Sequence, residues 1–395
     1  MSVFPLTGAV RPYAWGSRTL IAELQGRPAP TEGPEAELWL GAHPGDPSTV
    51  TAPDGPVKLD ALITADPKAQ LGEPVEAAFG PRLPFLLKVL AAESPLSLQA
   101  HPDLEYAKQA YARQEADPSL PKNYTDAYHK PEMLVAVTPF EALCGFRDPA
   151  KAADAIGAFA IPALEPVVTA LRGGDLRAAV ETLLSWPTED RPALIEAVVA
   201  AAGAAGADHP QAASFALATS LAGHYPGDPG VLVALLLNHV RLEPGEAIWM
   251  PAGNLHAYLR GAGVELMAAS DNVLRGGLTP KRVDVAELLN VLRFEVLEDP
   301  ILHSESVAPG VDTWPVPVAD FVLYRVTLDG TRPPTEVPVG GPRIIVSIAG
   351  DVFVGESIDG TPVELTPGTA AFASADAGQI KVAGTGQVFV AAVPA

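Results

Sequence analysis

The pattern of apolar and polar positions predicts a mainly β chain with an α-helical insertion. Over residues 37–146, short apolar runs alternate with Pro and Gly breaks, which is typical of short strands, and helix is secondary there. Over residues 149–221, the composition shifts to Ala with scattered Leu, Val and Glu, which favours helices. A further helical stretch is expected around residues 283–292. Strand patterns return at residues 231–240, 247–250 and 321–395.

A repeated sequence pattern supports two β units. Residues 242–249 and 365–372 both read Leu-x-Pro-Gly-x-Ala-x-aromatic. A Pro-Gly turn before an apolar strand also recurs by chance in β proteins, so coincidence remains an alternative. The first copy continues to His256, whereas the second offers no histidine at the corresponding place. Only the first copy can therefore supply an imidazole ligand there.

Length, charge and cysteine content narrow the classes of function. At 395 residues, the chain exceeds what one hydrophobic core usually serves. Its 47 acidic and 26 basic side chains give a net charge of -21, which argues against nucleic-acid and membrane partners. The single cysteine, Cys144, excludes a disulfide framework and a Cys-rich zinc module. The chain begins without a secretory pattern, and its apolar run at residues 231–237 is too short to span a bilayer. We expect a soluble, cytoplasmic protein.

Candidate chemistry lies on the polar faces of predicted strands, because residues two apart in a strand share a face. These faces carry Ser97, Gln99 and His101, then Lys130 and Glu132, and then His256 and Tyr258. A fourth strand, residues 85–90, is apolar except for Lys88, whose burial is costly. The solvated side of an antiparallel sheet is the ordinary interpretation of any one such pattern. Taken together, however, these glutamine, histidine and glutamate side chains are unusual for a solvated face.

Two imidazoles, one carboxylate and one amide oxygen suit a divalent metal with mixed nitrogen and oxygen ligands, most simply zinc. With a neutral oxygen as the fourth ligand, water or substrate can still bind. The other histidines that we interpret as structural are His43, His209, His224, His239 and His303. The four candidates are far apart in the sequence, unlike the ligands of a His-Glu-x-x-His helix, so their spacing alone does not establish a metal site.

Seven ordered motifs carry a resemblance to a known family, at residues 13–16, 37–44, 83–89, 99–103, 129–133, 251–258 and 270–275. With these motifs the chain resembles type I mannose-6-phosphate isomerases, which are zinc enzymes of the cupin superfamily. One departure lies at residues 9–12, where the family has an Asn-bearing run, and it puts only edge contacts of the pocket in doubt. The resemblance implies an enzyme of carbohydrate metabolism, with one Zn²⁺ per chain, that interconverts mannose 6-phosphate and fructose 6-phosphate through an enediol.

The resemblance also implies the fold and the partners. It implies two cupin-type jelly-roll β units and an inserted helical domain. Residues 1–147 and 231–297 would form the catalytic jelly roll, residues 148–230 the helical domain, and residues 298–395 a C-terminal jelly roll without a metal site. The partner would be a phosphorylated hexose, with no nucleic acid and no membrane, and we expect a monomer.

The resemblance assigns a role to each candidate side chain. The implied zinc ligands are Gln99, His101, Glu132 and His256, the same four that strand alternation selects. The implied phosphate ligands are Lys88, Ser97 and Lys281. Lys88 is favoured because a dianionic ligand would offset its desolvation. On this basis, replacing Lys88 should raise the KM for the phosphorylated sugar more than it changes stability. The alternative interpretation of Lys281 is a solvated loop residue.

The remaining roles concern the reaction itself. Arg275 would stabilise the enediolate, with a surface cation as the alternative. The sequence does not choose a proton-transfer group among Lys130, His129, Glu265 and Asp271. Side chains that would line the pocket and bind hydroxyls are Tyr258, Trp15 and Glu37. Core packing is the alternative for the two aromatic residues.

Two rival functions are a metal-dependent cupin oxygenase and a noncatalytic sugar-binding cupin. Oxygenases also use histidines and a glutamate, but they prefer iron with open positions. The glutamine ligand and the lysines argue against an oxygenase. The complete set of ligands and cations argues against a noncatalytic protein.

Overall fold

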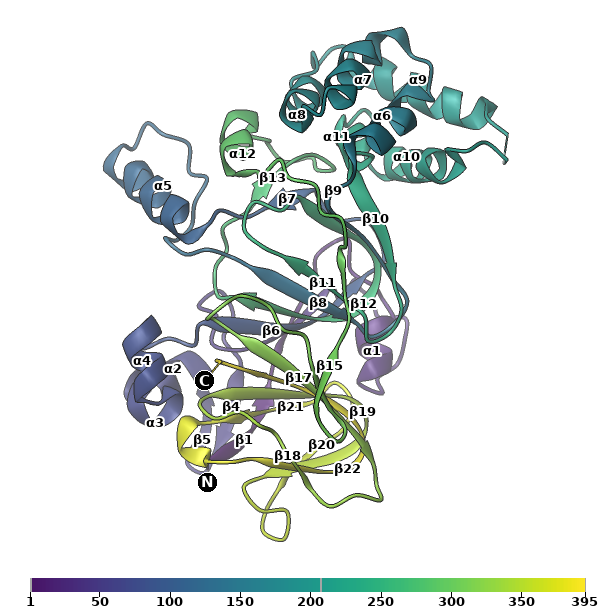
Figure 1. Cartoon of the computed structure of the whole chain (residues 1–395). Helices are drawn as coiled ribbons and strands as arrows, with labels where there is room; N and C mark the ends of the chain where they lie inside the picture. The colour runs from purple at the N-terminus through teal and green to yellow at the C-terminus, as the bar shows by residue number, and fades with distance from the viewer. Residues whose placement is uncertain (1, 207, 395) are drawn as a thin grey trace.

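The computed structural model describes residues 2–206 and 208–394. Figure 1 shows two β units stacked on one another, with a group of helices beyond the upper unit. Each unit is built around one antiparallel sheet of eleven strands. We call these the first sheet, in the upper unit, and the second sheet, in the lower unit. Among the described residues, no helix is both long enough and apolar enough to cross a membrane.

The first sheet carries most of the candidate residues. Its strands are β2 (Ala9–Arg11), β3 (Glu37–Leu40), β6 (Phe85–Ala92), β7 (Gln99–Ala100), β8 (Glu132–Ala136), β9 (Phe140–Phe146), β10 (Leu237–Leu242), β11 (Ala247–Met250), β12 (His256–Ala268), β13 (Leu274–Arg275) and β14 (Ile301–Leu302). The beginning of β12 pairs with β7 and β9, and from Gly261 onwards it pairs with β6 and β8. Gly261 has a φ of +121°, and a Cβ there would lie 2.6 Å from the Pro139 carbonyl oxygen. A glycine is therefore required where β12 passes between its two sets of partners.

The second sheet combines the C-terminal strands with three N-terminal ones. Its strands are β1 (Val3–Thr7), β4 (Thr49–Ala52), β5 (Gly55–Lys58), β15 (Glu305–Ala308), β16 (Val311–Thr313), β17 (Val322–Asp329), β18 (Thr335–Glu336), β19 (Arg343–Gly355), β20 (Val363–Leu365), β21 (Ala370–Ala373) and β22 (Lys381–Ala392). Strand β1 lies between β21 and β4. The predicted domain boundaries remain a proposal. Hydrogen bonds join β1, β4 and β5, which lie within residues 1–147, to the sheet formed by strands of residues 298–395.

The helical insertion lies between β9 and β10. Its helices are α6 (Pro149–Gly157), η1 (Pro162–Leu164), α7 (Glu165–Arg172), α8 (Leu176–Leu184), α9 (Arg191–Ala204), α10 (Ala212–His224) and α11 (Gly230–Ala234). Side chains of Asp148 and Asp175 cap the starts of α6 and α8 by accepting backbone N–H groups. The helices predicted over residues 149–221 are confirmed. The strand predicted from residue 231 is wrong up to residue 236, because a short, wholly apolar run suits a buried helix as well as a strand.

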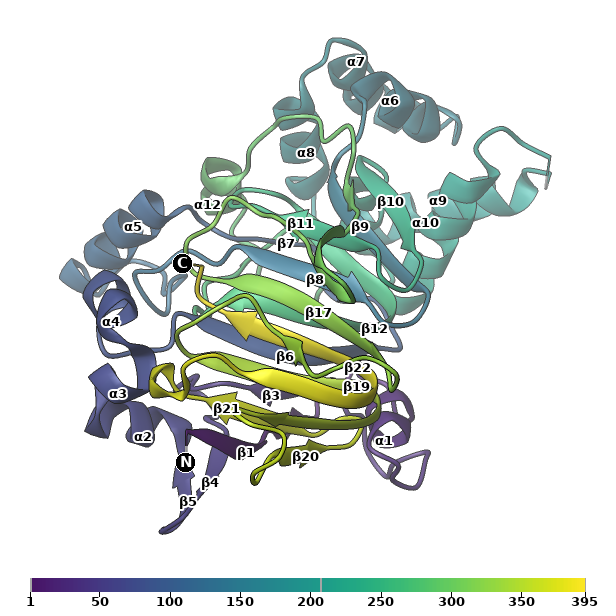
Figure 2. The same ribbon diagram turned by 60° about the horizontal axis from the view of Figure 1, so that its bottom comes forward.

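The remaining helices lie beside the two sheets. They are α1 (Leu20–Leu24), α2 (Leu59–Ala65), α3 (Pro67–Leu71), α4 (Glu73–Phe79), α5 (Leu104–Ala116), α12 (Val285–Val291) and η2 (Ala375–Ala377). Figure 2 shows α2, α3 and α4 grouped at one edge of the second sheet. Helix α12 confirms the helix expected around residues 283–292. The prediction that helix is secondary in residues 37–146 understated α2 to α5. Of these, α2, α3 and α4 are short and separated by Pro and Gly residues, which resembles a strand pattern.

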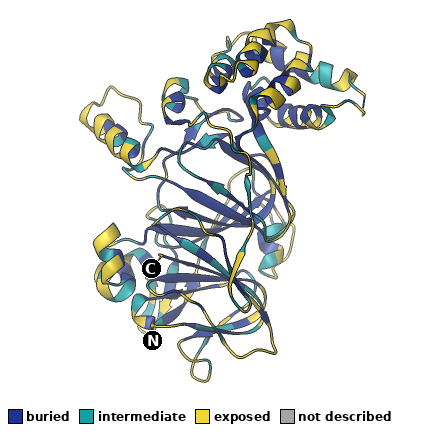
Figure 3. Ribbon diagram, viewed as in Figure 1, coloured by how far each residue is buried: buried dark blue, intermediate teal, exposed yellow. Residues whose placement is uncertain are grey.

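The two sheets share one apolar core, and one face of β6 packs into it. Phe85, Leu87 and Val89 of β6 belong to the same buried cluster as Phe372 and Phe389 of the second sheet. Figure 3 shows the strands of both units as mostly buried and the helices as exposed on their outer sides. Because side chains alternate along a strand, the even-numbered residues of β6 point into the first unit. Lys88 is one of them.

Both copies of the repeated sequence pattern form a turn followed by a strand. The copies end in β11 of the first sheet and β21 of the second sheet, and each strand follows a Pro-Gly turn. The turn glycines, Gly245 and Gly368, have φ values of +96° and +77°. Both positions therefore require glycine for the same backbone reason, which supports a common architecture for the two units.

Candidate metal centre and active site

A cavity of about 680 Å³ lies within the first unit. Its wall includes side chains of β3, β6, β8 and β12, together with residues 13–15 and several residues of the 271–281 segment. His224 and Tyr225, at the end of α10 in the helical insertion, also line it. The lining includes these candidates from the sequence: Trp15, Glu37, Lys88, Ser97, Gln99, Lys130, Glu132, His256, Tyr258, Glu265, Asp271, Arg275 and Lys281.

Three of the four predicted metal ligands converge beside this cavity. The ligand atoms of His101, Glu132 and His256 all lie within 4.8 Å of one another. Nε2 of His101 is 3.3 Å from Oε2 of Glu132, and Nε2 of His256 is 3.1 Å from the same oxygen. Each of the three residues is at most 3% exposed. They come from the segment after β7, from the start of β8 and from the start of β12.

The hydrogen bonds of the two imidazoles fix their tautomers. Nδ1 of His101 lies 2.7 Å from the carbonyl oxygen of Asn272, and Nδ1 of His256 lies 3.1 Å from that of Asn254. Because a carbonyl oxygen only accepts, each Nδ1 carries the proton and each Nε2 presents a lone pair. Nε2 of His101 is buried and has no hydrogen-bond partner. Both imidazoles are thus oriented as metal ligands usually are.

A zinc ion fits this arrangement of atoms. Two nitrogen lone pairs face one carboxylate oxygen of Glu132, which is unfavourable unless a cation lies among them. Tetrahedral zinc with bonds near 2.1 Å places neighbouring ligand atoms about 3.4 Å apart. The contacts of 3.1 and 3.3 Å are close to that spacing. The two histidines and Glu132 would therefore hold the ion.

Gln99 is placed consistently with the role of a fourth ligand. It pairs with His256 in the β7–β12 register, and its side chain borders the cavity. Its amide nitrogen lies 3.3 Å from the hydroxyl of Ser97. In that contact the amide nitrogen donates, so the amide oxygen remains free to act as a ligand. The role of Gln99 as a ligand remains a prediction.

Lys130 balances the charge of the Glu132 carboxylate. Its Nζ lies 2.8 Å from Oε1 of Glu132, whereas Oε2 faces the two histidines. Burial by itself raises the pKa of Glu132, but the charge of Lys130 and the contacts with His101 outweigh it and hold this pKa well below its ordinary value. Glu132 is therefore ionised, as a zinc ligand must be.

The metal-free protein is expected to lose stability as the pH falls from about 6.5 towards 4. Burial lowers the pKa of His101 from 6.5 to about 4. Between these two pH values, His101 is protonated in the unfolded chain but not in the folded chain. The free energy of unfolding therefore decreases as the pH falls, by about 3 kcal/mol in all. Urea unfolding of chelator-treated protein at several pH values measures this loss.

Replacing His101 with asparagine is the control for that pH dependence. The H101N variant lacks the titrating ring, so its unfolding free energy should depend less steeply on pH than that of the wild-type chain. Equal slopes for the two proteins would contradict the assignment of the effect to His101.

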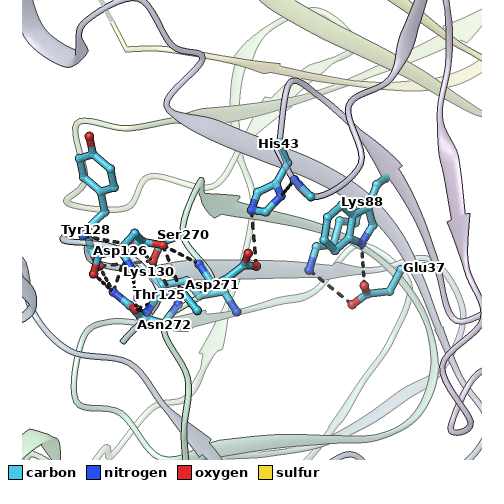
Figure 4. Close-up of polar contacts among 12 residues, drawn as sticks. Glu37, His43, Lys88, Thr125, Asp126, Tyr128, Lys130, Ser270, Asp271 and Asn272 are labelled. Carbon is cyan, nitrogen blue, oxygen red and sulfur yellow. Dashed lines mark hydrogen bonds and ion pairs between the residues drawn. The ribbon is translucent and has the colours of Figure 1, made fainter. Parts of the chain in front are cut away.

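A buried ion-pair network adjoins the metal site. Nζ of Lys88 lies 3.0 Å from Oε2 of Glu265 and 3.4 Å from Oε1 of Glu37. Trp39 Nε1 donates to Glu37 at 2.7 Å, and the Tyr258 hydroxyl donates to Glu265 at 2.7 Å. Figure 4 shows Lys88 directed towards Glu37. The desolvation of Lys88 is therefore offset by two carboxylates of the chain itself.

The network also shifts the pKa values of its members. Burial raises the pKa of Glu265, and the neighbouring charge of Lys88 partly opposes that rise. Burial lowers the pKa of Lys88, but the two carboxylates outweigh burial and raise it. Burial and the charge of Glu265 together raise the pKa of Tyr258 well above its ordinary value. Lys88 is consequently a fixed cation, and Tyr258 is a neutral hydroxyl.

Two further cations line the cavity without carboxylate partners. Arg275 is half-buried and Lys281 is exposed. Among the described residues, neither side chain lies within 4.0 Å of an acidic oxygen. In a chain with a net charge of -21, unpaired cations around one cavity indicate a place for an anion. Arg275 and Lys281 differ in this respect from Lys88, whose charge is neutralised by Glu37 and Glu265.

The structure brings three of the four proposed proton-transfer residues to the cavity and separates the fourth. Lys130, Glu265 and Asp271 line it. His129 does not line it, and its Nε2 lies 2.9 Å from Asp320 of the lower unit. Both residues precede β8, and their side chains point to different partners. Lys130 forms an ion pair with Glu132, whereas His129 contacts Asp320.

Sequence reasoning missed the residues that orient the metal ligands. The Asn272 side chain is completely buried, accepts the backbone N–H of Thr125 at 2.9 Å and donates to the carbonyl oxygens of Asp126 and Tyr128. These bonds, drawn in Figure 4, fix the loop whose carbonyl holds His101. Asn272 lies within the 270–275 motif, but nothing in the local pattern indicates its partner segment 125–128.

The comparisons with known proteins cover the whole chain. A model of the type I phosphomannose isomerase catalytic domain matches residues 3–149. The mannose-6-phosphate isomerase of Escherichia coli is 35% identical over 391 residues, covering 97% of each chain. The human mannose-6-phosphate isomerase is 33% identical over 406 residues, covering 95% of this chain and 94% of its own.

Solved structures agree with these relatives. A crystal structure of a zinc-bound mannose 6-phosphate isomerase matches with a TM-score of 0.91 and 33% identity, covering 100% of both chains. A variant of the phosphomannose isomerase of Salmonella typhimurium matches with the same TM-score and identity. The fold expected from the sequence, with two cupin-type β units and an inserted helical region, is thereby confirmed. The chain belongs to the type I phosphomannose isomerase family.

Proposed function

We propose that this protein is a zinc-dependent isomerase that interconverts mannose 6-phosphate and fructose 6-phosphate. The observation that carries the proposal is the cluster of His101, Glu132 and His256 beside a cavity with unpaired cations. Full-length similarity to mannose-6-phosphate isomerases favours this activity over the oxygenase and the noncatalytic alternatives.

The reaction requires a proton to move between C2 and C1 of the opened sugar, through an enediol whose oxygens carry developing negative charge. When bound, zinc supplies a Lewis acid that polarises the sugar oxygens. Arg275 adds a fixed cation at the same cavity and is our proposed second stabiliser of the enediolate. Burial lowers the pKa of Arg275, but an arginine remains charged at neutral pH.

The phosphate group is assigned to the mouth of the cavity. Lys281 is exposed there without an acidic partner, and the hydroxyl of Ser97 lines the same cavity. A dianionic phosphate gains more from an unpaired lysine than from one already neutralised, so we place it at Lys281 and Ser97. Lys88 then acts mainly by holding Glu265 and Glu37 in place.

Three residues remain for proton transfer. Lys130, Glu265 and Asp271 line the cavity, and each is tied to a partner: Lys130 to Glu132, Glu265 to Lys88, and Asp271 to His43. Asp271 is the least enclosed, since its side chain is 53% exposed and its oxygen is 3.4 Å from Nε2 of His43. The backbone N–H of Gly45 donates to Nδ1 of His43, so the proton of this ring lies on Nε2 and faces Asp271. Trp15, Tyr258 and Glu37 complete the wall for the sugar hydroxyls.

Treatment with a chelator is expected to abolish the isomerisation of mannose 6-phosphate, and zinc is expected to restore it. The measurement is a coupled assay of fructose 6-phosphate formation before and after the metal is returned. Glucose 6-phosphate and free mannose are the comparison substrates. Glucose 6-phosphate keeps the phosphate but differs in sugar configuration, and free mannose lacks the phosphate. Undiminished activity in metal-free protein would reject the metal mechanism, and equal turnover of free mannose would reject the phosphate site.

We retain a monomer as part of the proposal. Cys144, the one cysteine of the chain, is buried and unpaired, and burial raises the pKa of its thiol to about 12. A protonated, enclosed thiol suits a reducing compartment, and we retain a cytoplasmic location as part of the proposal.

A further inference from the structure

The segment after β13 follows a constrained path along the cavity. Gly277 has a φ of +115°, and Leu278, which is completely buried, has a φ of +52°. A left-handed conformation is costly for leucine, so the surrounding contacts must impose it. This bend lies between the two unpaired cations, Arg275 and Lys281.

Asp228 of the helical insertion holds this segment from the other side. Its Oδ2 accepts the backbone N–H of Thr279 at 2.9 Å, and its Oδ1 accepts that of Gly230 at 2.7 Å. The Thr279 hydroxyl in turn accepts the backbone N–H of Lys281 at 3.1 Å. A continuous series of bonds therefore runs from Asp228 to the backbone of Lys281.

Backbone packing reinforces the contact between the insertion and the segment. A Cβ at Gly277 would lie 2.6 Å from Cα of Gly230, and one at Gly230 would lie 2.6 Å from N of Leu278. Glycine is needed on both sides for so close an approach. The insertion therefore contacts the segment directly, through backbone atoms.

Arg275 is held independently of this contact. It pairs with Gln99 in the β13–β7 register, and the backbones of Gly276 and Gly277 bond to Leu98. Only the part of the segment that follows Gly277 depends on Asp228. Loss of Asp228 should thus displace Lys281 more than Arg275.

We propose that Asp228 is a positioning residue that holds the Lys281 segment, so that the helical insertion takes part in binding the substrate phosphate. The inference rests on the proposed function, which places the phosphate at Lys281. The proposed role of Asp228 gives the helical insertion a function in substrate binding. The insertion also contributes His224 and Tyr225 to the cavity wall.

The test compares D228A and D228N with the wild-type zinc-loaded enzyme. Each variant is expected to raise the KM for mannose 6-phosphate about tenfold, because a displaced binding group loses its alignment, with kcat changed by no more than about twofold. Zinc content should stay unchanged. Hydrogen exchange at the amides of Thr279 and Lys281 should become faster in both variants. D228N keeps the shape of the side chain and guards against a folding defect in D228A.

Asp175 provides the matched control. It is another insertion aspartate that accepts a backbone N–H, that of Ala178 at 2.9 Å, and it does not line the cavity. D175A should lower thermal stability while leaving the KM unchanged. An unchanged KM and unchanged exchange in the Asp228 variants would overturn the inference, as would an equal rise of KM in D175A. A wild-type chain without isomerase activity would overturn the proposed function, and the exchange rates would still test the Asp228 contact.

Discussion

Replacing Glu132 with glutamine is expected to remove zinc and nearly all isomerase activity while preserving the metal-free fold. The glutamine amide oxygen can still accept from Lys130, and its NH₂ group can donate to the lone pairs of His101 and His256. The variant therefore satisfies the protein atoms that the wild-type chain leaves facing one another. It loses the charge that holds a cation, and with it several kcal/mol of stabilisation of the transition state, or about a thousandfold in rate.

The E132Q result is read from three measurements on the same preparation. These are zinc per chain after dialysis, kcat/KM for mannose 6-phosphate, and the unfolding free energy of the metal-free protein. The matched control is E141Q, because Glu141 lies 3.7 Å from a histidine, His239, outside the catalytic cavity. E141Q should keep zinc and activity. A fully active, zinc-loaded E132Q would refute the assignment of Glu132 as a ligand.

Replacing Lys88 with methionine is expected to destabilise the fold by about 3–5 kcal/mol, because it leaves Glu265 and Glu37 buried without their cation. The sequence-based expectation, a KM effect larger than the stability effect, is thereby revised. Without Lys88 the pKa of Glu265, already raised by burial, rises further, so the variant binds a proton more readily when folded than when unfolded. The stability deficit should shrink as the pH is lowered from about 8 to about 5.

Urea unfolding across this pH range measures the Lys88 effect. The K88M/E265Q double variant should be more stable than the sum of the single effects predicts, since it removes both ends of the pair. The matched control is K108A, which removes an exposed lysine paired with Glu105 and should change stability by less than about 0.5 kcal/mol. A K88M deficit as small as that of K108A would show that the network contributes little to stability.

Strand alternation alone predicted which side chains meet at the candidate metal site. It put Lys130 on the face of Glu132, and the structure joins these side chains at 2.8 Å. It also selected His101 and His256 from among the histidines, and both reach Glu132. Alternation works here because the period of a strand is fixed by backbone geometry, whatever the strand pairs with. His129 was predicted only as one of four candidates for proton transfer, and the structure directs it away from the cavity to Asp320.

Contacts between distant strands were not predictable in this way. Lys88 and Glu265 are direct partners in the β6–β12 register, across 177 positions of sequence. A local pattern shows which residues share a face, but not which strand lies beside it, because register is set by packing of the whole unit. The pairing of β1 with β21, which joins the start of the chain to its C-terminal part, escaped prediction for the same reason.

Anomalous diffraction at the zinc absorption edge, from crystals grown without added metal, tests whether His101, Glu132 and His256 share one zinc ion. We expect one zinc peak per chain, within about 2.0–2.3 Å of Nε2 of His101, a carboxylate oxygen of Glu132 and Nε2 of His256. A peak bound by other residues, or zinc-free crystals of fully active protein, would contradict this expectation.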